Sequence, residues 1–422
     1  MNYKFKSFLI VTLILLMVLS ETIFSVFSVF KYIDEGLTIL LGLIIIFKLG
    51  FLKRHNRPLF ILFLLYGLLV FIGLMNNLIF KVQPNFTAIL IDVVATVKLI
   101  VFIIGFYLIL DPHTNRQTFK LLAPIAKVFI FLGFVFSIVN LIVDIGMRGQ
   151  TRFGIPGYNF IFTHAHTYSM FTFFFLLVLV ATTKKGFTLG RFALYAIVQT
   201  ALTLKGPSII WGGLFILFLL YFKRFRKVGV IALVVAGLLV LALGTYQIQA
   251  YFLTPSAPRS RLFSYGFQTL LDYHFLGSGF ATFGSYASAI YYSPLYVKYG
   301  FEGVYGMSST DYQFLSDNYW PSVMAQFGLI GLLIVVGMAI YMFKVLQSKR
   351  YPSTIKAVLF SCYFYLLLHS IGSSTPTISA AAVMAIGMVM VVKSEDYRLA
   401  YKRYVYEKEK DCQAVDSPAN AV

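Results

Sequence analysis

Residues 192–222 read FALYAIVQTALTLKGPSIIWGGLFILFLLYF, an apolar run that is broken near its middle by Lys205, Gly206 and Pro207. One helix crosses the apolar part of a bilayer with about 20 residues, so the run is too long for one span and each half is short. Because Gly and Pro interrupt helices, we expect two short helices joined at these three residues. Interrupted segments of this kind surround polar sites in membrane proteins, and they also serve as simple connectors between tilted helices.

The composition of the whole chain agrees with a membrane environment. Hydrophobic residues make up 59% of the 422 residues and charged residues only 12%. The net charge of +19 is carried by short basic clusters between apolar runs, which indicates membrane topology rather than a nucleic-acid partner. The two cysteines, Cys362 and Cys412, provide neither a disulfide framework nor a metal cluster, and we expect no metal and no cofactor.

The apolar runs predict an all-α polytopic membrane protein with about twelve transmembrane helices. The expected spans lie near residues 7–29, 36–52, 59–79, 88–110, 121–145, 163–182, 192–204, 208–222, 228–247, 321–343, 355–372 and 376–392. The first run follows MNYKFK and has no small-residue cleavage site, so it is expected to remain as a helix.

The basic residues predict which loops face the cytoplasm. If the N-terminus lies inside, every second loop is basic, as the positive-inside rule requires. The residues concerned are Lys53, Arg54, Arg57, Arg116, Lys120, Lys184, Lys185, Arg191, residues 223–227, Lys349, Arg350 and Lys393. The pattern predicts a single transmembrane domain over residues 1–392, a charged cytoplasmic tail over residues 393–422, and both termini inside.

One predicted outer loop, residues 249–319, is long enough to build a site. Loops of this length are usually functional or disordered, and the many tyrosines argue against disorder. We therefore expect one large folded extracytoplasmic loop. Tyrosines such as Tyr265 can stack on sugar rings, or they can form an interfacial belt at the membrane surface.

Four basic residues fall in the external segments that the pattern singles out: Arg152, Lys205, Arg259 and Arg261. The last two lie in PSAPRSRLFSY, residues 255–265. Arginine presents a planar fork that fits phosphate oxygens, so the set predicts an anionic ligand tethered to the membrane. The alternative for each residue alone is contact with lipid headgroups or with a loop carboxylate.

Three stretches together resemble the superfamily of O-antigen ligases and Wzy-type polysaccharide polymerases. They are TRFGIPGYNF from Thr151, RLFSYGFQTLLDYHFLGSGFATF from Arg261 and SDNYWPSVMAQFGLIGLL from Ser316. The resemblance covers residues 148–335 and rests on order, spacing and membrane side rather than on any one motif. Two positions depart from the family pattern: Lys205 stands where many relatives have arginine, and Asp317 stands where ligases commonly have histidine.

The resemblance implies a glycosyltransferase with a C-type architecture in the cytoplasmic membrane of a bacterium. Such enzymes transfer a glycan from a polyprenyl diphosphate to a sugar hydroxyl on the outer face, with no nucleotide and no metal. The implied partners are the lipid-linked oligosaccharide, the bilayer, and a flippase and a chain-length regulator of the same pathway. Asp317 in place of histidine favours a polymerase of repeat units over a ligase that transfers finished glycan to an acceptor.

The predicted site follows from the charges that this transfer requires. Arg261 is expected to stabilise the leaving diphosphate and Asp317 to accept the proton of the attacking hydroxyl. The predicted substrate-binding residues are Arg152, Lys205, Arg259, Asn159, His166, Asn318 and Tyr265. Glu302 and Asp311 are alternative bases, and Asp317 or Asn318 can instead cap the helix that contains Pro321.

A transporter or flippase is the main rival. Ionisable residues within predicted spans, among them Glu21, Asp92 and Lys98, are what a substrate pathway would contain. Asp92 and Lys98 lie in the same expected span, and we expect them to pair with each other or to guide the lipid diphosphate. The large outer loop favours the enzyme, because a transporter has less need of a folded external cap.

Overall fold

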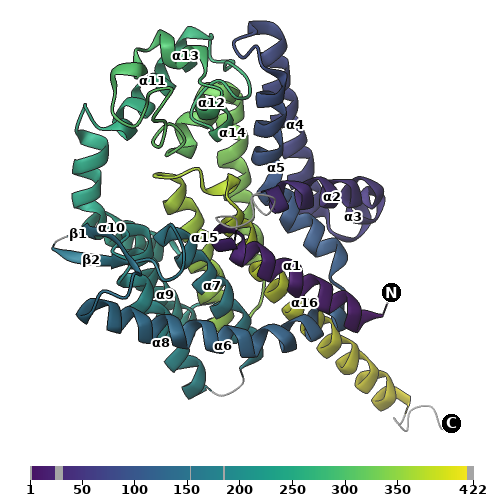
Figure 1. Ribbon diagram of the computed structural model, residues 1–422. Helices are drawn as coiled ribbons and strands as arrows, with labels where there is room; N and C mark the ends of the chain where they lie inside the picture. The colour runs from purple at the N-terminus through teal and green to yellow at the C-terminus, as the bar shows by residue number, and fades with distance from the viewer. Residues whose placement is uncertain (1, 24–31, 153, 184–185, 416–422) are drawn as a thin grey trace.

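The computed structural model describes residues 2–23, 32–152, 154–183 and 186–415 (Figure 1). Each of the twelve expected spans overlaps one of the main helices, but the span near residues 36–52 also includes part of α3 (Leu49–His55), and residues 24–29 of the first expected span lie outside the described residues. These helices are α1 (Tyr3–Ile23), α2 (Ile33–Phe47), α4 (Arg57–Phe80), α5 (Phe86–Ile109), α6 (Pro112–Ile142), α7 (Ala165–Thr182), α8 (Gly186–Ala201), α9 (Gly206–Arg224), α10 (Val230–Ile248), α14 (Tyr319–Ser348), α15 (Ser353–Ser370) and α16 (Ser379–Val415).

The remaining elements are short. They are α3 (Leu49–His55), the π-helical turn η2 (Gln249–Leu253), α11 (Pro258–Asp272), α12 (Tyr286–Ile290), α13 (Pro294–Lys298), the 3₁₀ turns η3 (Phe301–Gly303) and η4 (Thr375–Thr377), and the strands β1 (Arg148–Arg152) and β2 (Ile155–Tyr158). The two strands form an antiparallel hairpin, with Arg152 opposite Ile155.

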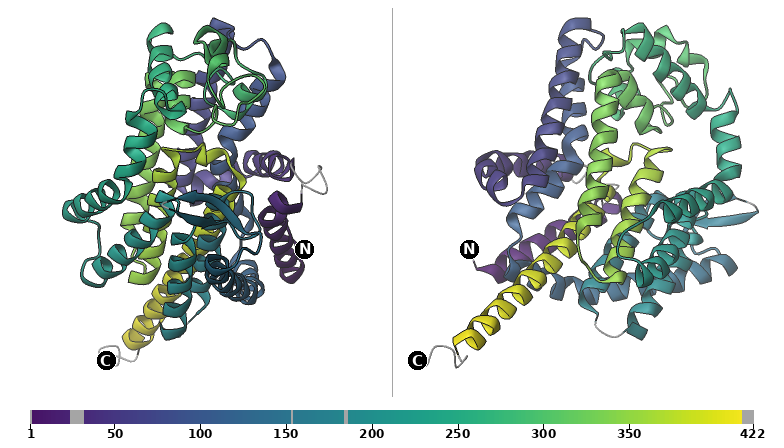
Figure 2. Two further views of the ribbon diagram at one scale, coloured as in Figure 1. Left: turned by 60° about the vertical axis from the view of Figure 1, so that its left-hand side comes forward. Right: turned by 180° about the vertical axis from the view of Figure 1, so that it is seen from behind.

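Seven of the described helices are long and apolar enough to cross a membrane, and the bent pair α2 and α3, which turns by 69°, would make eight. The protein is therefore an all-α polytopic membrane protein apart from its one small hairpin. Helices α4, α5 and α14 stand upright beside one another in Figure 1, whereas α6 runs across the lower end, as both views of Figure 2 also show. The twelve-span topology itself stays a prediction.

The break predicted in residues 192–222 is confirmed. Helix α8 ends at Ala201 and α9 begins at Gly206, with Pro207 in its first turn, where the missing N–H costs nothing. Leu204 between them has a φ of +54°, a conformation that continues neither helix. The result is a sharp junction, residues 202–205, between two short helices.

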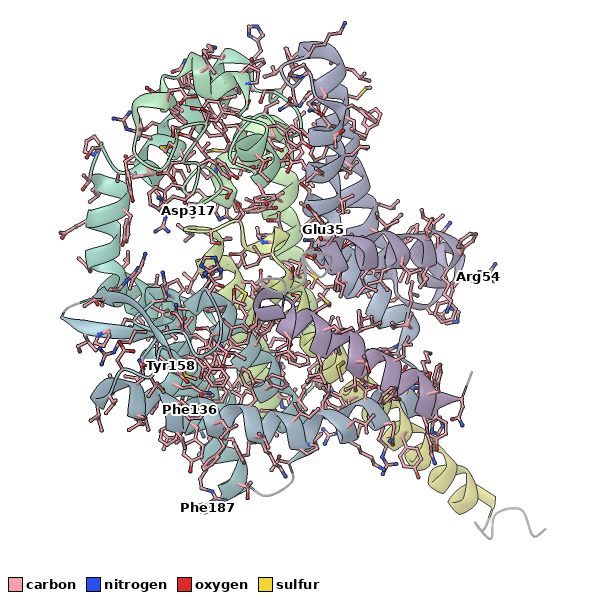
Figure 3. The ribbon with its side chains drawn as sticks, in the orientation of Figure 1. Glu35, Arg54, Phe136, Tyr158, Phe187 and Asp317 are labelled. Atoms are coloured by element: carbon pink, nitrogen blue, oxygen red, sulfur yellow. The ribbon has the colours of Figure 1, made fainter. Side chains whose placement is uncertain are left out.

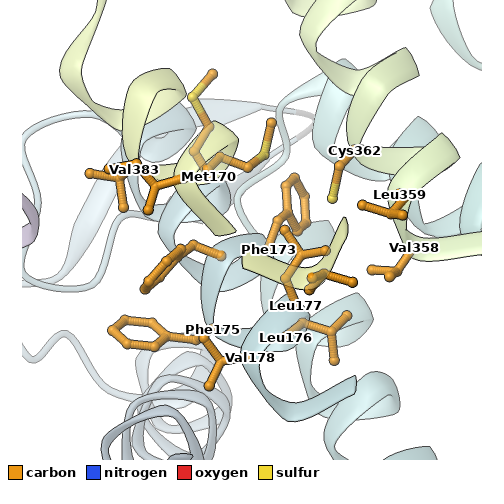
Figure 4. Close-up of a cluster of buried hydrophobic side chains, with 14 of the residues drawn as sticks. Met170, Phe173, Phe175, Leu176, Leu177, Val178, Val358, Leu359, Cys362 and Val383 are labelled. Atoms are coloured by element: carbon orange, nitrogen blue, oxygen red, sulfur yellow. The ribbon is translucent and has the colours of Figure 1, made fainter. Parts of the chain in front are cut away.

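Helix α7 is the centre of the lower half of the molecule. Its side chains are buried from Ala165 to Val180, on every face, by α6, α8, α9, α15 and α16. Figure 4 shows Phe173 and Leu177 of α7 beside Cys362 and Leu359 of α15. The start of α16, with Ala380 to Ala382, is rich in small residues, which lets this helix approach α7 closely.

A second group consists of α4, α5 and α14, and between them lies an inserted segment, residues 275–283. Its main chain is bound by buried amides: Asn77 both donates to and accepts from Phe280, and Gln83 donates to the carbonyl of Ala281. Gly277 and Gly279 both have a φ of +94°, which the close packing against α4 and α14 requires. The Gly-rich stretch thus fixes backbone in the bundle interior.

The inserted segment is part of a larger region, the cap, defined here as residues 258–318, which contains α11, α12, α13 and η3. The tyrosines of the cap mostly form its own core, where Tyr265 stacks on Tyr299 with ring centroids 4.8 Å apart. Tyr296 is fully buried and its hydroxyl accepts from the amide of Gly284. The prediction that this region is folded agrees with these contacts, and its position outside the membrane stays a prediction.

The predicted pairing of Asp92 with Lys98 is wrong. Asp92 accepts a hydrogen bond of 2.6 Å from the amide of Ala281, in the inserted segment, and borders a cavity of about 20 Å³, room for about one water. Lys98 instead binds Asp34 and Glu35 of α2, and Ser379 donates to the same Asp34 carboxylate. Positions 92 and 98 are six apart and so do not share one helix face, since neighbours on a face are three or four apart.

The charged tail does not begin a separate element at residue 393. Helix α16 continues without a break to Val415, and Lys393 is buried, donating to the main-chain carbonyls of Tyr107 and Leu110. Asp396 binds Lys349 and accepts from the hydroxyl of Tyr351. The first turns of the predicted tail are therefore packed on the bundle.

Candidate functional site

The β hairpin lies on the junction between α8 and α9. The amide of Tyr158 donates to the carbonyl of Leu202 at 3.0 Å, and the guanidinium of Arg152 donates to the carbonyl of Leu204 at 3.3 Å. Lys205 is the N-cap residue of α9. The hairpin thus brings Arg152 beside Lys205, although 52 residues separate Arg152 from Leu204.

The two ends of the cap meet in an ion pair. Arg259 lies in the first turn of α11, and its Nη2 is 3.2 Å from Oδ2 of Asp317, which directly precedes the N-cap of α14. Packing of α11 against α14 holds the two ends together. Figure 3 shows Asp317 at the lower edge of the cap, above the hairpin that ends at Tyr158.

A third segment, the strap, residues 371–378 between α15 and α16, reaches the same ion pair. The guanidinium of Arg259 lies against Gly372, where a Cβ would be 3.4 Å from Cζ. The hydroxyl of Ser374 donates to the carbonyl of Ser316 at 2.6 Å. On another side, the ring of Tyr251 lies 4.8 Å from the guanidinium carbon of Arg259, in cation–π geometry.

Three histidines form a row at the start of α7 and the end of α15. The rings of His164 and His166 stack with centroids 5.2 Å apart, and the ring of His369 follows 4.9 Å from that of His166. Nδ1 of His369 is 2.7 Å from the hydroxyl of Thr375 in the strap. The charge of Lys205 acts on all three rings, so the row borders the cationic site.

The electrostatics of the site are dominated by positive charge. Burial, together with the charges of Arg152 and Arg259, lowers the pKa of Lys205 to about 8, and Asp317 opposes the shift. Burial raises the pKa of Asp317, while Arg259 and Lys205 oppose that shift. Burial and the charge of Lys205 also lower the pKa of His164.

Three cations and one carboxylate therefore converge from three separate parts of the chain. The arrangement leaves excess positive charge in a partly buried place, which is the requirement for binding a multivalent anion. Three of the four basic residues singled out in the sequence, Arg152, Lys205 and Arg259, are brought together. Arg259 binds the predicted base Asp317, and the charge of Lys205 also acts on it.

Arg261 is the exception among the predicted cations. It stands two positions after Arg259 in α11, and residues two apart do not face the same side of a helix. Its Nε is buried and has no hydrogen-bond partner in the described residues. The arginine of this loop that contacts Asp317 is Arg259.

The other predicted binding residues differ in their surroundings. His166 is half-buried in the histidine row. Asn318 is buried, with its terminal amide atoms 3.3 Å from the carbonyl of Arg259 and 3.1 Å from that of Ile371. Asn318 does stand at the N-cap of α14, yet its side chain makes no capping hydrogen bond. Asn159 donates to the carbonyl of Thr163 and shapes the turn after the hairpin.

The alternative bases are engaged within the cap. Glu302 accepts from the amide of Ser309, and Asp311 accepts from the side chain of Gln313. Within the described ranges, no group of three or more His, Cys, Asp or Glu side chains is arranged to hold a metal ion.

Sequence reasoning missed the strap and His369. The signal that could have found them is the stretch HSIGSSTPTIS, residues 369–379, a run of small and hydroxyl residues that interrupts two apolar runs. Tyr251 was seen only as one of many tyrosines. No protein-family model and no curated protein matches the chain.

Proposed function

We propose that the protein is a glycosyltransferase that uses a polyprenyl-diphosphate-linked glycan as donor, and that it acts as a polymerase of oligosaccharide repeat units. The observation that carries the proposal is the site at Lys205. Three cations meet there with one carboxylate, and burial together with the charges of Arg152 and Arg259 lowers the pKa of the lysine to about 8. Such a place favours an anion with two or more charges.

A membrane-bound diphosphate fits this place better than a soluble anion does. The site is carried by helices that are long and apolar enough for a membrane, so a lipid-linked donor can reach it from the bilayer. Arg152, Lys205 and Arg259 would bind the diphosphate oxygens, with the two arginines supplying planar forks. The positive end of the α9 helix dipole, beside Lys205, adds further positive potential.

The proposed reaction needs these residues in distinct roles. The bond between the anomeric carbon and the diphosphate oxygen breaks, and the electron pair leaves with the diphosphate, whose charge the cations stabilise. The acceptor hydroxyl forms the new bond to that carbon and gives its proton to the carboxylate of Asp317. The reaction written in this way needs no nucleotide and no redox step.

The residue at position 317 also favours a polymerase over a ligase. Asp317 stands where the ligases of the family that the sequence resembles commonly have histidine. The cellular setting follows from the proposal: the outer face of a bacterial cytoplasmic membrane, with a flippase to supply the donor and a chain-length regulator as partner.

Transport is a second candidate, and one observation favours it. Lys98 and Asp34 are buried and form a polar cluster with the half-buried Glu35 and Ser379 where α2, α5 and α16 meet. Buried ionisable residues in membrane helices often mark substrate or proton pathways. A structural ion pair that holds these three helices together would have the same geometry.

The test is a reconstituted reaction. Purified protein in proteoliposomes is given a synthetic polyprenyl diphosphate that carries one repeat unit, and the products are separated by size. A polymerase gives a ladder of repeat units that Lys205→Ala and Arg259→Ala abolish. Movement of the donor across the bilayer with no change in its size would identify a transporter, and transfer of a preassembled chain to a separate acceptor would identify a ligase.

A further inference from the structure

The ion pair between Arg259 and Asp317 raises a conflict between two roles. In the proposed function Arg259 binds the donor diphosphate and Asp317 accepts a proton, yet the two side chains are bound to each other at 3.2 Å. A carboxylate that is held by a guanidinium is a weaker base than a free one. A guanidinium that is held by a carboxylate has fewer N–H groups for phosphate.

Both side chains can exchange partners without refolding the site. Arg259 is 25% exposed and Asp317 is 31% exposed, so neither is sealed from an incoming ligand. Arg259 has further supports in the ring of Tyr251 and the main chain at Gly372. The backbone at Asp317 is fixed by its amide, which donates to the carbonyl of Phe314. Rotation of one carboxylate is the only movement required.

The charges favour the exchange in one direction. Arg259 and Lys205 are the charged groups that lower the pKa of Asp317, against the effect of burial. A bound diphosphate would neutralise both cations and remove this effect, which makes the freed carboxylate a better base. A diphosphate also has more charge than one carboxylate and is bound more strongly by the same fork.

We propose that the carboxylate of Asp317 is bound to the guanidinium of Arg259 when no donor is present. The donor diphosphate then takes the place of the carboxylate on Arg259, and the released carboxylate accepts the proton of the acceptor hydroxyl. This inference rests on the proposed function. It gives the reaction an order, in which the donor binds before Asp317 can act. The base is then unavailable until the anomeric carbon is in place.

The experiment measures binding of a polyprenyl diphosphate that carries no sugar to the purified protein in nanodiscs, for Asp317→Asn, Arg259→Ala and the double variant. Asp317→Asn removes the competitor and should bind about twofold to fivefold more tightly, the range expected for a partly exposed ion pair. Arg259→Ala should bind more weakly. In the double variant the tightening should vanish, because there is no guanidinium left to release.

Controls separate exchange from general electrostatics and from folding. Asp311→Asn removes a half-buried charge that is bound within the same cap, and it should leave affinity unchanged. The same comparison of single and double variants is repeated with Arg259→Gln, which replaces the arginine with an uncharged side chain of similar length. Thermal melting of each variant checks the fold. In synthesis, Asp317→Asn should lower the transfer rate by about a hundredfold while it improves donor binding.

Two results would overturn the exchange alone: unchanged affinity in Asp317→Asn, or an equal gain of affinity in the Arg259→Ala background. Either leaves the proposed function standing if the wild-type protein binds the diphosphate. A wild-type protein that does not bind it would overturn both.

Discussion

Lys205 is the one cation of the site whose charge depends on pH in an accessible range. Burial and the neighbouring Arg152 and Arg259 lower its pKa to about 8, so it is charged below pH 8 and neutral above it, whereas the arginines stay charged. We expect kcat/KM for the donor to fall as pH rises above about 8, because free-enzyme groups govern this ratio. In Lys205→Arg the fall should move to higher pH. Initial rates between pH 6 and 10 measure both profiles.

A matched control is Lys298→Arg in the exposed part of the cap. Lys298 binds Asp272, which lies at the opposite end of α11 from Arg259. This change should leave the profile where it is in the wild type. If Lys205→Arg kept the wild-type decline, the titrating group would be another residue.

Arg259 and Arg261 can be compared directly, since they lie in one turn of α11. Arg259 binds Asp317 and interacts with Lys205, whereas Arg261 points to another side of the helix. We expect Arg259→Ala to weaken donor binding at least tenfold, the scale of a lost charged hydrogen bond, and Arg261→Ala to weaken it less. Donor titrations of the two variants, with melting curves for each, make the comparison. The reverse order would restore Arg261 as the main diphosphate ligand.

At the scale of elements, the inserted segment, residues 275–283, depends on one break in α14. Gly328 has φ +69° and ψ −164° within the helix, and a Cβ there would lie 2.3 Å from main-chain atoms of Phe275 and Leu276. The break allows the amide of Leu329 to donate to the carbonyl of Phe275. Main-chain atoms cannot give way as a flexible side chain can.

Gly328→Ala should therefore destabilise the protein by about 2–4 kcal/mol through strain and overpacking. Gly337→Ala is the matched control, because it lies in the same helix with open space around it and should be neutral or slightly stabilising. Thermal melting in detergent and the amount of protein in the membrane report the difference. Equal melting temperatures for the two variants would show that the segment is not packed as described.

The elements that the sequence predicted are those that carry a continuous apolar signal. Each expected span overlaps a helix, although the span near residues 36–52 is divided between α2 and α3, and the break at Lys205 was marked by Gly206 and Pro207. The hairpin and the strap carry no such signal, because small and polar residues follow no hydrophobic period. Their positions depend on long-range contacts, such as Ser374 with Ser316, that no local pattern encodes.

The same distinction explains which site residues were predicted. Charge in a mostly uncharged chain singled out Arg152, Lys205 and Arg259, whereas Asp317 was identified from the stretch that resembles the family. Which arginine meets Asp317 depends on helix rotation, and which acid meets Lys98 depends on how α2 packs on α5. Neither can be read from composition or spacing.

At the scale of the whole molecule, the candidate site lies where three regions meet. The lower half around α7 contributes the hairpin and Lys205, the cap contributes Arg259 and Asp317, and the strap joins them from the end of α15. A site built at such a meeting point can respond to relative movement of its parts. The exchange proposed for Asp317 would need only a side-chain movement within this frame.

The membrane side of the site can be tested with two cysteines. If the basic loops face the cytoplasm, residue 224 at the end of α9 lies inside and residue 290 in the cap lies outside. Arg224→Cys and Ile290→Cys are introduced one at a time into a chain with Cys362 and Cys412 replaced; both positions are exposed. In intact cells a membrane-impermeant maleimide should label position 290 and should label position 224 only after permeabilisation.

Because Lys205 begins the helix that ends at Arg224, this result would also put the cationic site on the cap side, where a polyprenyl diphosphate donor would present its glycan. Labelling of both positions from the same side would contradict the predicted parity and, with it, transfer at the outer face.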